Sequence, residues 1–285
     1  PVISSIADRT INEDTSSGTI GFAISDVDSG LSACTVTITS SNQSVVKDAD
    51  ITLGGSGANR TITLSPVEDS SGTTTITVKV DDQSGAANSK TTATFEVIVN
   101  AVNDAPKIDD IADVTIDEEG TTGDIPFGFS DVDDSPLTVS ASTDNTAMVP
   151  KANIVLTKVT DTSYKVKVTP VTNKFGKATI TITVKDSSGL MASDSFDVTV
   201  NSVNDLPTLS VISDLSTNED TAKTVSLTIS DVETAASSLT MSAESSTNTG
   251  LIPTGNITVS STGASRTMTL TPIANAHGES TITVR

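Results

Sequence analysis

The sequence predicts an all-β chain of tandem antiparallel sandwiches, and two observations carry this prediction. The first is a long internal repeat: residues 102–106 (VNDAP) return as 203–207 (VNDLP), and the chain opens on the equivalent proline, Pro1. The second is a period of two in the apolar residues, with no convincing helical spacing anywhere. A period of two is typical of half-buried strands.

The repeat divides the chain into domains. Pro1, Pro106 and Pro207 are 105 and 101 residues apart, and an acidic cluster, a D-x-D or D-x-E group, a second proline and a glycine follow each of them in the same order. A period near 100 residues exceeds a solenoid unit, at roughly 20 to 50, and matches one small domain. We therefore expect three domains, at 1–103, 104–204 and 205–285, the last truncated before its final strand. We also expect the chain to be a piece of a longer protein.

The strands follow in order from the alternation. After an opening strand through Ile3 and Ile6, repeat 1 alternates over 20–24, 36–38, 51–53, 62–64, 76–80 and 95–99. Repeat 2 does so over 125–129, 137–139, 154–156, 166–168, 180–184 and 196–200. Seven short strands per repeat, separated by turn residues, indicate a two-sheet antiparallel sandwich of the immunoglobulin-like (Ig-like) class. A single barrel is the alternative, and the sandwich is favoured because one domain end must meet the next in line.

Composition narrows the function classes. The net charge of −20 argues against nucleic acid or an anionic membrane as a partner, and suits divalent cations. No apolar run is long enough to span a bilayer, so we expect no membrane insertion in this segment. Aromatic residues make up 2% of the chain, so the cores must be aliphatic, and Cys34 has no second cysteine with which to form a disulfide.

Acidic residues gather at equivalent ends of successive domains. Because successive strands run up and down, the turns near Glu13 and Glu68 should lie at the bottom of domain 1, and those near Asp131 and Asp186 at the top of domain 2. The predicted first-junction set is Glu13, Asp14, Glu68, Asp69, Asn103, Asp104, Asp131, Asp133 and Asp186. The second-junction set is Glu118, Glu119, Asn173, Asn204, Asp205, Asp231 and Glu233. Asp26, Asp28 and Asp82 would face a preceding domain.

Carboxylates brought together in this way repel one another unless they are protonated or neutralised by a cation. Calcium fits them because it takes six to eight oxygen ligands in loose geometry. Ordinary turn formation by Asn and Asp is the alternative explanation of each group taken alone. At the second junction Asn173 replaces Asp69 and Glu233 replaces Asp133, so we expect fewer or weaker ions there.

The Asn-Glu-Asp, Asp-Val-Asp and Val-Asn-Asp-Ala-Pro landmarks resemble those of bacterial cadherin-like and Ig-like repeats of large surface and secreted proteins, including adhesins. The resemblance covers essentially the whole chain. It implies an extracellular array, stiffened by calcium and arranged end to end. Carried over by residue, it implicates Glu13, Asp69, Asn103, Asp104, Asp131, Asp133 and Asp186, and Glu68 less firmly because repeat 2 has Thr172 there.

These features predict a non-catalytic stalk segment of a cell-surface or secreted bacterial adhesin. Its partners would be neighbouring repeats of the same chain, with a host-surface, sugar or protein ligand bound by other domains. One histidine, His277, and one cysteine do not support a nucleophilic site in each domain. The alternatives are a laterally assembling sheath, surface-layer or filament component, and a carbohydrate-binding module. The absence of Trp and the single Tyr164 count against the module.

Overall fold

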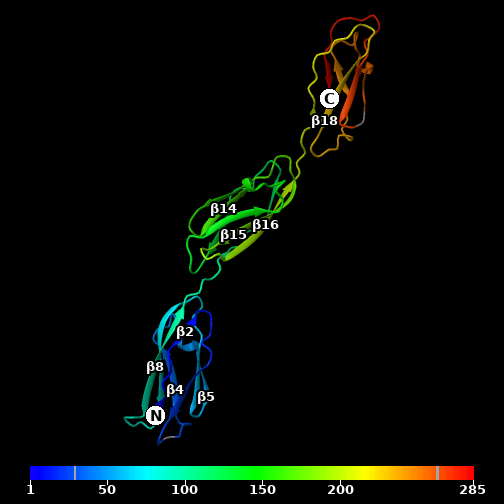
Figure 1. The fold of residues 1–285 in the computed structure, drawn as a ribbon. Helices are drawn as coiled ribbons and strands as arrows, with labels where there is room; N and C mark the ends of the chain where they lie inside the picture. Colours follow the sequence, from blue (N-terminus) through cyan, green and yellow to red (C-terminus); the bar gives the residue numbers. More distant parts are fainter. Residues whose placement is uncertain (29, 261–262) are drawn as a thin grey trace. The chain divides into compact units, whose positions relative to one another are not determined.

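The computed structural model describes residues 1–28, 30–260 and 263–285, and these residues are almost entirely strand, turn and loop (Figure 1). The only helices among them are three short 3-10 turns, η1 (Asp48–Asp50), η2 (Lys151–Asn153) and η3 (Thr254–Asn256). No helix within the described ranges has the length and apolar character needed to cross a membrane. The predicted all-β class is confirmed, as the abundance of Val, Ile and Thr leads one to expect.

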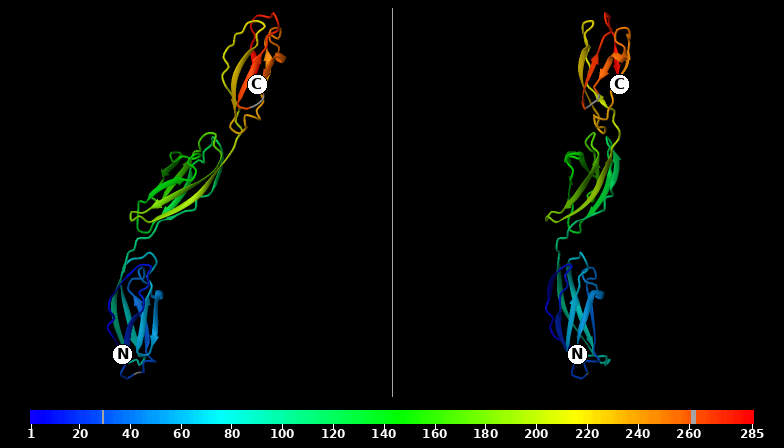
Figure 2. Two further views of the ribbon diagram at one scale, coloured as in Figure 1. Left: turned by 45° about the vertical axis from the view of Figure 1, so that its right-hand side comes forward. Right: turned by 90° about the vertical axis from the view of Figure 1, so that its right-hand side faces the viewer.

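The first sandwich consists of two four-stranded sheets, with strand orders β1-β3-β6-β5 and β2-β8-β7-β4. Figure 2 shows the two layers of strands. The strands are β1 (Val2–Ile3), β2 (Arg9–Asn12), β3 (Ile20–Ser25), β4 (Thr35–Ser40), β5 (Ile51–Ser56), β6 (Asn59–Leu64), β7 (Gly72–Asp81) and β8 (Lys90–Asn100).

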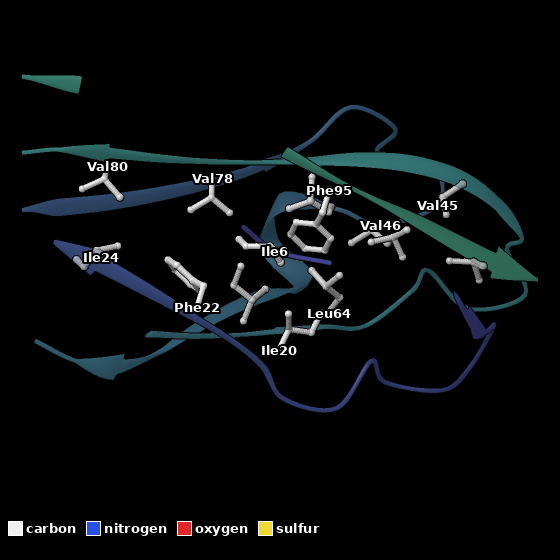
Figure 3. Close-up of a cluster of buried hydrophobic side chains, with 14 of the residues drawn as sticks. Ile6, Ile20, Phe22, Ile24, Val45, Val46, Leu64, Val78, Val80 and Phe95 are labelled. Carbon is white, nitrogen blue, oxygen red and sulfur yellow. The ribbon is translucent and has the colours of Figure 1, made fainter. Parts of the chain in front are cut away.

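Alternating side chains from both sheets fill the space between the layers. In β7, Ile76, Val78 and Val80 are fully buried while the residues between them face outward. Figure 3 shows Phe22 and Phe95 entering the same cluster from opposite sheets. The core is therefore aliphatic with few rings, as the composition predicts.

The opening strand is not the single strand through Ile3 and Ile6 that the sequence predicts. It is split: β1 pairs antiparallel with β3 in one sheet, and β2 pairs parallel with β8 in the other. Ile6 lies buried between them, and Asp8 Oδ1 accepts the Glu96 amide at 2.7 Å beside the crossing. The purely antiparallel description is thus wrong for this one pair in each of the first two repeats.

The second sandwich repeats this plan, with strand orders β13-β14-β11-β9 and β10-β16-β15-β12. Its split opening strand again gives a parallel pair, β10 with β16. The strands are β9 (Lys107–Ile108), β10 (Val114–Asp117), β11 (Ile125–Ser130), β12 (Thr138–Thr143), β13 (Ile154–Lys158), β14 (Ser163–Val168), β15 (Gly176–Lys185) and β16 (Met191–Asn201).

The third sandwich contains fewer strands, in the orders β17-β18-β21-β20 and β19-β22. Within the described residues, no strand between β17 and β18 corresponds to β2 or β10. Leu227, Ile257, Met268 and Leu270 form its core. The strands are β17 (Thr208–Leu209), β18 (Lys223–Ser230), β19 (Ala243–Ser246), β20 (Ile257–Val259), β21 (Ser265–Leu270) and β22 (Ile282–Val284).

The chain divides into two compact units, which are described separately below. The first unit comprises Pro1–Lys107, Ser130–Thr138 and Val184–Ala192. The second comprises Ile108–Phe129, Val139–Thr183 and Ser193–Arg285. The predicted first-junction set therefore falls within the first unit, and the predicted second-junction set falls within the second.

The core of the first sandwich provides a stability prediction. Replacing Ile76 with Ala should cost about 2–5 kcal/mol of folding free energy, because a fully buried side chain leaves a cavity between the sheets. Urea unfolding, together with hydrogen exchange of the β7 amides, measures the loss of folding free energy. Thr75→Ala on the same strand faces solvent and should cost less than about 1 kcal/mol. Equal losses in the two variants would contradict the assigned core.

Candidate metal centres at the linkers

Three aspartates from separate parts of the first unit come together beside the first linker. Asp14 follows β2, Asp69 lies in the turn between β6 and β7, and Asp104 lies after β8. One carboxylate oxygen of each lies within 4.8 Å of those of the other two. These three residues, which belong to the predicted first-junction set, form what we call the first linker cluster.

Backbone geometry of the two turns brings Asp14 and Asp69 together. Both adopt left-handed conformations, with φ of 57° and 53°, which Asp and Asn tolerate better than most residues. Asp14 Oδ1 accepts a hydrogen bond from the Asp69 amide at 3.1 Å. The hydrogen bond fixes one turn against the other.

The same turn pair recurs in both other repeats. Glu119 accepts from the Asn173 amide at 3.0 Å, and Asp220 accepts from the Asn275 amide at 2.9 Å. All four of these residues also have positive φ. Asp14 and Asp69 therefore have a structural role in the turns that requires no ion.

Asp104 has no such explanation. Its amide donates to Asp133 Oδ2 at 2.9 Å, while its own Oδ2 is buried and, within the described residues, lacks a hydrogen-bond partner. Burial, followed by the negative charges of Asp69, Asp14, Asp133 and Glu13, raises the pKa of the Asp104 carboxyl. An added cation would relieve both effects.

Glu13 anchors the linker to the sandwich that it leaves. Its side chain is buried, and Oε1 accepts the amide of Val102 at 2.7 Å. In the second unit, Glu118 accepts the amide of Val203 at the same distance. Both glutamates thus hold the residues immediately before an Asn-Asp pair.

Two aspartates in the turn after β11, Asp131 and Asp134, accept backbone amides. Asp131 Oδ1 accepts the amides of Asp133 and Asp134, each at 2.9 Å, and its Oδ2 is a second buried oxygen without a partner in the described part of the chain. Asp134 Oδ2 accepts the Ser187 amide at 2.7 Å and joins this turn to the one after β15. Sequence reasoning missed Asp134, although the run Asp-Val-Asp-Asp contains it.

Asn103 and Asp186 meet directly, because Asn103 Nδ2 donates to Asp186 Oδ2 at 2.7 Å. Burial raises the pKa of Asp186, but hydrogen bonds from Asn103, Ser188 and the amides of Gly189 and Leu190 outweigh it and hold the pKa below its usual value. Asp186 is therefore a satisfied carboxylate that orients the linker amide.

Glu68 does not join the first linker cluster. It lines the wall of an open pocket of about 750 Å³ beside the cluster, together with Asp14, Asp69, Asp104 and Asp131.

The second unit contains a different cluster, which we call the second linker cluster: Glu118, Asp205 and Glu233, again within 4.8 Å of one another. The Asp205 amide donates to Glu233 Oε2 at 2.9 Å. Glu118 Oε2, Asp205 Oδ2 and Glu233 Oε1 are each buried, with no partner in the described residues. Since Glu118 is only 4% exposed, this cluster is better shielded from water than the first.

The other residues of the predicted second-junction set lie outside this cluster. Glu119 and Asn173 form the turn pair, and Asn204 Nδ2 donates to the backbone carbonyl of Asp205 at 2.8 Å. Asp231 Oδ1 accepts the amides of Glu233 and Thr234 at 3.1 and 2.7 Å, so it shapes the loop that presents Glu233.

A third group combines Asp26, Asp28 and Asp82, at positions equivalent to Asp131, Asp133 and Asp186. The Asp28 amide donates to Asp26 Oδ1 at 3.1 Å, as the Asp133 amide does to Asp131 Oδ1 at 2.9 Å.

The residues fit a hard divalent cation. Each linker cluster offers carboxylate oxygens, which calcium prefers, on loops that impose no strict geometry. Buried carboxylate oxygens without hydrogen bonds are costly, and an ion would satisfy them. The candidate ligands are Asp14, Asp69 and Asp104 in the first unit, and Glu118, Asp205 and Glu233 in the second.

One segment of the chain matches the model of a known protein family. Residues 103–201 match the model of the bacterial Ig domain family. The predicted resemblance to bacterial Ig-like repeats is confirmed by this match. No curated protein matches the sequence.

Solved structures with similar folds include the extracellular cadherin domains 1–4 of protocadherin gamma B7, at 13% identity and a TM-score of 0.41, covering 99% of this chain and 75% of that one. A titin I-band fragment aligns at 10% identity and a TM-score of 0.36, covering 95% and 87%. An endo-fucoidan hydrolase of glycoside hydrolase family 107 aligns at 16% identity and a TM-score of 0.30, covering 98% and 42%. At these scores the likenesses carry no argument about function.

The electrostatics of the first linker cluster can be tested without metal. In calcium-free buffer the Asp104 carboxyl should titrate above the ordinary aspartate value of about 3.9, and Asp69→Asn should lower its pKa because a negative neighbour is removed. NMR of the carboxyl carbon measures both values. Because the folded pKa is raised, ionising Asp104 opposes folding above that pKa, and the effect is absent below the unfolded pKa. An Asp104 pKa unchanged by the substitution would contradict the geometry.

Proposed function

We propose that this chain is a non-catalytic stalk segment of a large bacterial cell-surface or secreted adhesin-like protein, in which calcium at the linkers stiffens the array. The proposal is carried by Glu118, Asp205 and Glu233. One carboxylate oxygen of each lies within 4.8 Å of those of the other two, and each side chain has a buried oxygen without a partner among the described residues. The first linker cluster supports it from an independent set of residues.

The bound ion would supply charge neutralisation and a bridge between loops. At the first linker it would join the turns of Asp14 and Asp69 to Asp104, whose amide already holds Asp133. Glu13 and Asn103 would keep the linker backbone in place on either side. Without the ion, mutual repulsion of the carboxylates favours opening of the linker.

Calcium is favoured over magnesium for a physical reason. Magnesium demands near-ideal octahedral geometry and keeps several waters, whereas calcium accepts six to eight oxygens in flexible arrangements. Ligands that come from two turns and a linker suit the looser requirement. Extracellular calcium modules bind with dissociation constants of about 10⁻⁴ to 10⁻³ M, and we expect this range here.

We propose no catalytic role for the clusters because of the residue types that form them. Their oxygens are aspartate and glutamate carboxylates held by backbone amides, with no neighbouring histidine or cysteine in the group. The bacterial Ig domain match to residues 103–201 fits a repeat whose task is to space and orient other domains. Any ligand would then be bound elsewhere in the longer protein.

The proposal predicts a calcium-dependent shape. Small-angle X-ray scattering should show a longer and stiffer particle with calcium than with chelator, and calorimetry should show saturable binding. In the presence of calcium, Asp131→Asn with Asp133→Asn should increase bending at the first linker while circular dichroism shows intact folds, because the double substitution removes two negative charges that would attract the ion beside Asp104.

Asp161→Asn is the matched control, because it also removes a surface carboxylate but lies in an exposed pair with Lys158. It should leave both scattering profiles unchanged. If the wild-type chain neither binds calcium nor changes shape, the stalk mechanism is overturned, and lateral assembly becomes the better explanation of the repeats.

A further inference from the structure

Arg266 is a buried cation in the core of the third sandwich. Its side chain is 1% exposed and points to the same side of β21 as Met268 and Leu270. None of the ion pairs within the described residues involves it. A buried guanidinium without a carboxylate needs other compensation, since removing it from water is costly.

The two shorter of the hydrogen bonds that compensate for this burial come from one loop. Arg266 Nη2 donates to the backbone carbonyls of Ala236 and Leu239, both at 2.9 Å, and Nη1 donates to the Ser260 carbonyl at 3.4 Å. Ala236 and Leu239 belong to the connection between β18 and β19, residues 231–242. The fork geometry of arginine allows it to hold two carbonyls of one loop at once.

The same loop carries part of the second linker cluster. Asp231 begins it, Glu233 follows, and Asp231 accepts the amides of Glu233 and Thr234. Ser238 then donates its amide to the Ala235 carbonyl at 2.8 Å, which closes the turn beside Ala236. Arg266 therefore holds the loop at Ala236 and Leu239, three and six residues after Glu233 along the chain.

The equivalent positions in the other sandwiches do something else. Arg60 is only partly buried, and its Nε donates to the Gly57 carbonyl in the turn of its own β5–β6 hairpin at 3.1 Å. Tyr164 packs on Phe127 and Phe129, with ring centroids 6.3 and 5.6 Å away. The corresponding connections, residues 26–34 and 131–137, are shorter than 231–242. The long loop is the one that needs a tether.

We propose that Arg266 is a positioning residue that holds loop 231–242 so that Glu233 meets Asp205 and Glu118 at the second linker. The inference rests on the proposed function only where its test measures calcium binding. Its structural part, the restraint of the loop, stands without an ion. Arg266 contacts no member of the cluster and acts through the loop backbone.

The test is a residue-resolved NMR titration of the full chain with calcium chloride. In the wild type, amide signals of Asp205 and Glu233 report the second linker, and those of Asp104 and Asp133 report the first. In Arg266→Met, which keeps an apolar volume in the core, the second-linker dissociation constant should rise about tenfold, as is usual when a group that orients a metal ligand is lost. The first-linker constant should not change.

Two further measurements separate positioning from general stability. In chelator, hydrogen exchange of the Thr234 and Ser238 amides should be faster in Arg266→Met, while β18 and β21 amides keep their protection. Arg266→Lys should restore part of the calcium affinity, because an ammonium can still donate to the carbonyls. If Arg266→Met unfolds the third sandwich, Arg266→Lys compared with the wild type provides the same test.

The matched control is Arg60→Met, which should change neither linker constant because no hydrogen bond joins Arg60 to the described residues of loop 26–34. Unchanged loop exchange and unchanged second-linker affinity in Arg266→Met would overturn the inference. If the wild type binds no calcium at the second linker, the proposed function fails there, and faster loop exchange in Arg266→Met still supports the tether.

Discussion

The hydrogen bond between a buried glutamate and the linker backbone is the constraint from which both clusters follow. Glu13 holds the amide of Val102, and Glu118 holds that of Val203. Each bond fixes where the chain leaves its sandwich, so the Asn-Asp pair that comes next starts from a defined position. Because the glutamate itself directly follows β2 or β10, the second part of the split opening strand, residues nearly ninety apart in sequence are joined at one end of the fold.

The two clusters differ although their repeats share a plan. Asp104 gathers with the turn aspartates of its own repeat, whereas Asp205 gathers with Glu118 and with Glu233 from the following loop. Glu233 stands where the second repeat has Asp133, and each accepts the amide of its linker aspartate at 2.9 Å. Asn173, in place of Asp69, removes one carboxylate from the turn side. The second cluster is built instead from Glu118, the linker and the following loop.

Sequence alone was sufficient for the strands and for the approximate grouping of the acids, because a period of two and a threefold repeat both leave direct traces in the residues. It was insufficient for the split opening strand. Ile3 and Ile6 read as one run, but a chain can cross between sheets wherever side chains such as Asp8 accept the backbone amides that the crossing exposes. It also missed Asp134 and Arg266, whose partners are backbone groups and leave no pattern in composition or spacing.

The third repeat separates what the turns need from what a linker ion would need. Asp220 and Asn275 form the same left-handed pair as Asp14 and Asp69, with the same hydrogen bond, although among the described residues neither belongs to a carboxylate cluster. Position 69 and its equivalents therefore require a residue that tolerates positive φ, which Asn satisfies as well as Asp. A negative charge there adds nothing to the turn. Asp69 is the only carboxylate at this position, and its neighbour Asp104 has a raised pKa. The charge of Asp69, unlike its backbone geometry, is a feature that only the cation we propose at the first linker would require.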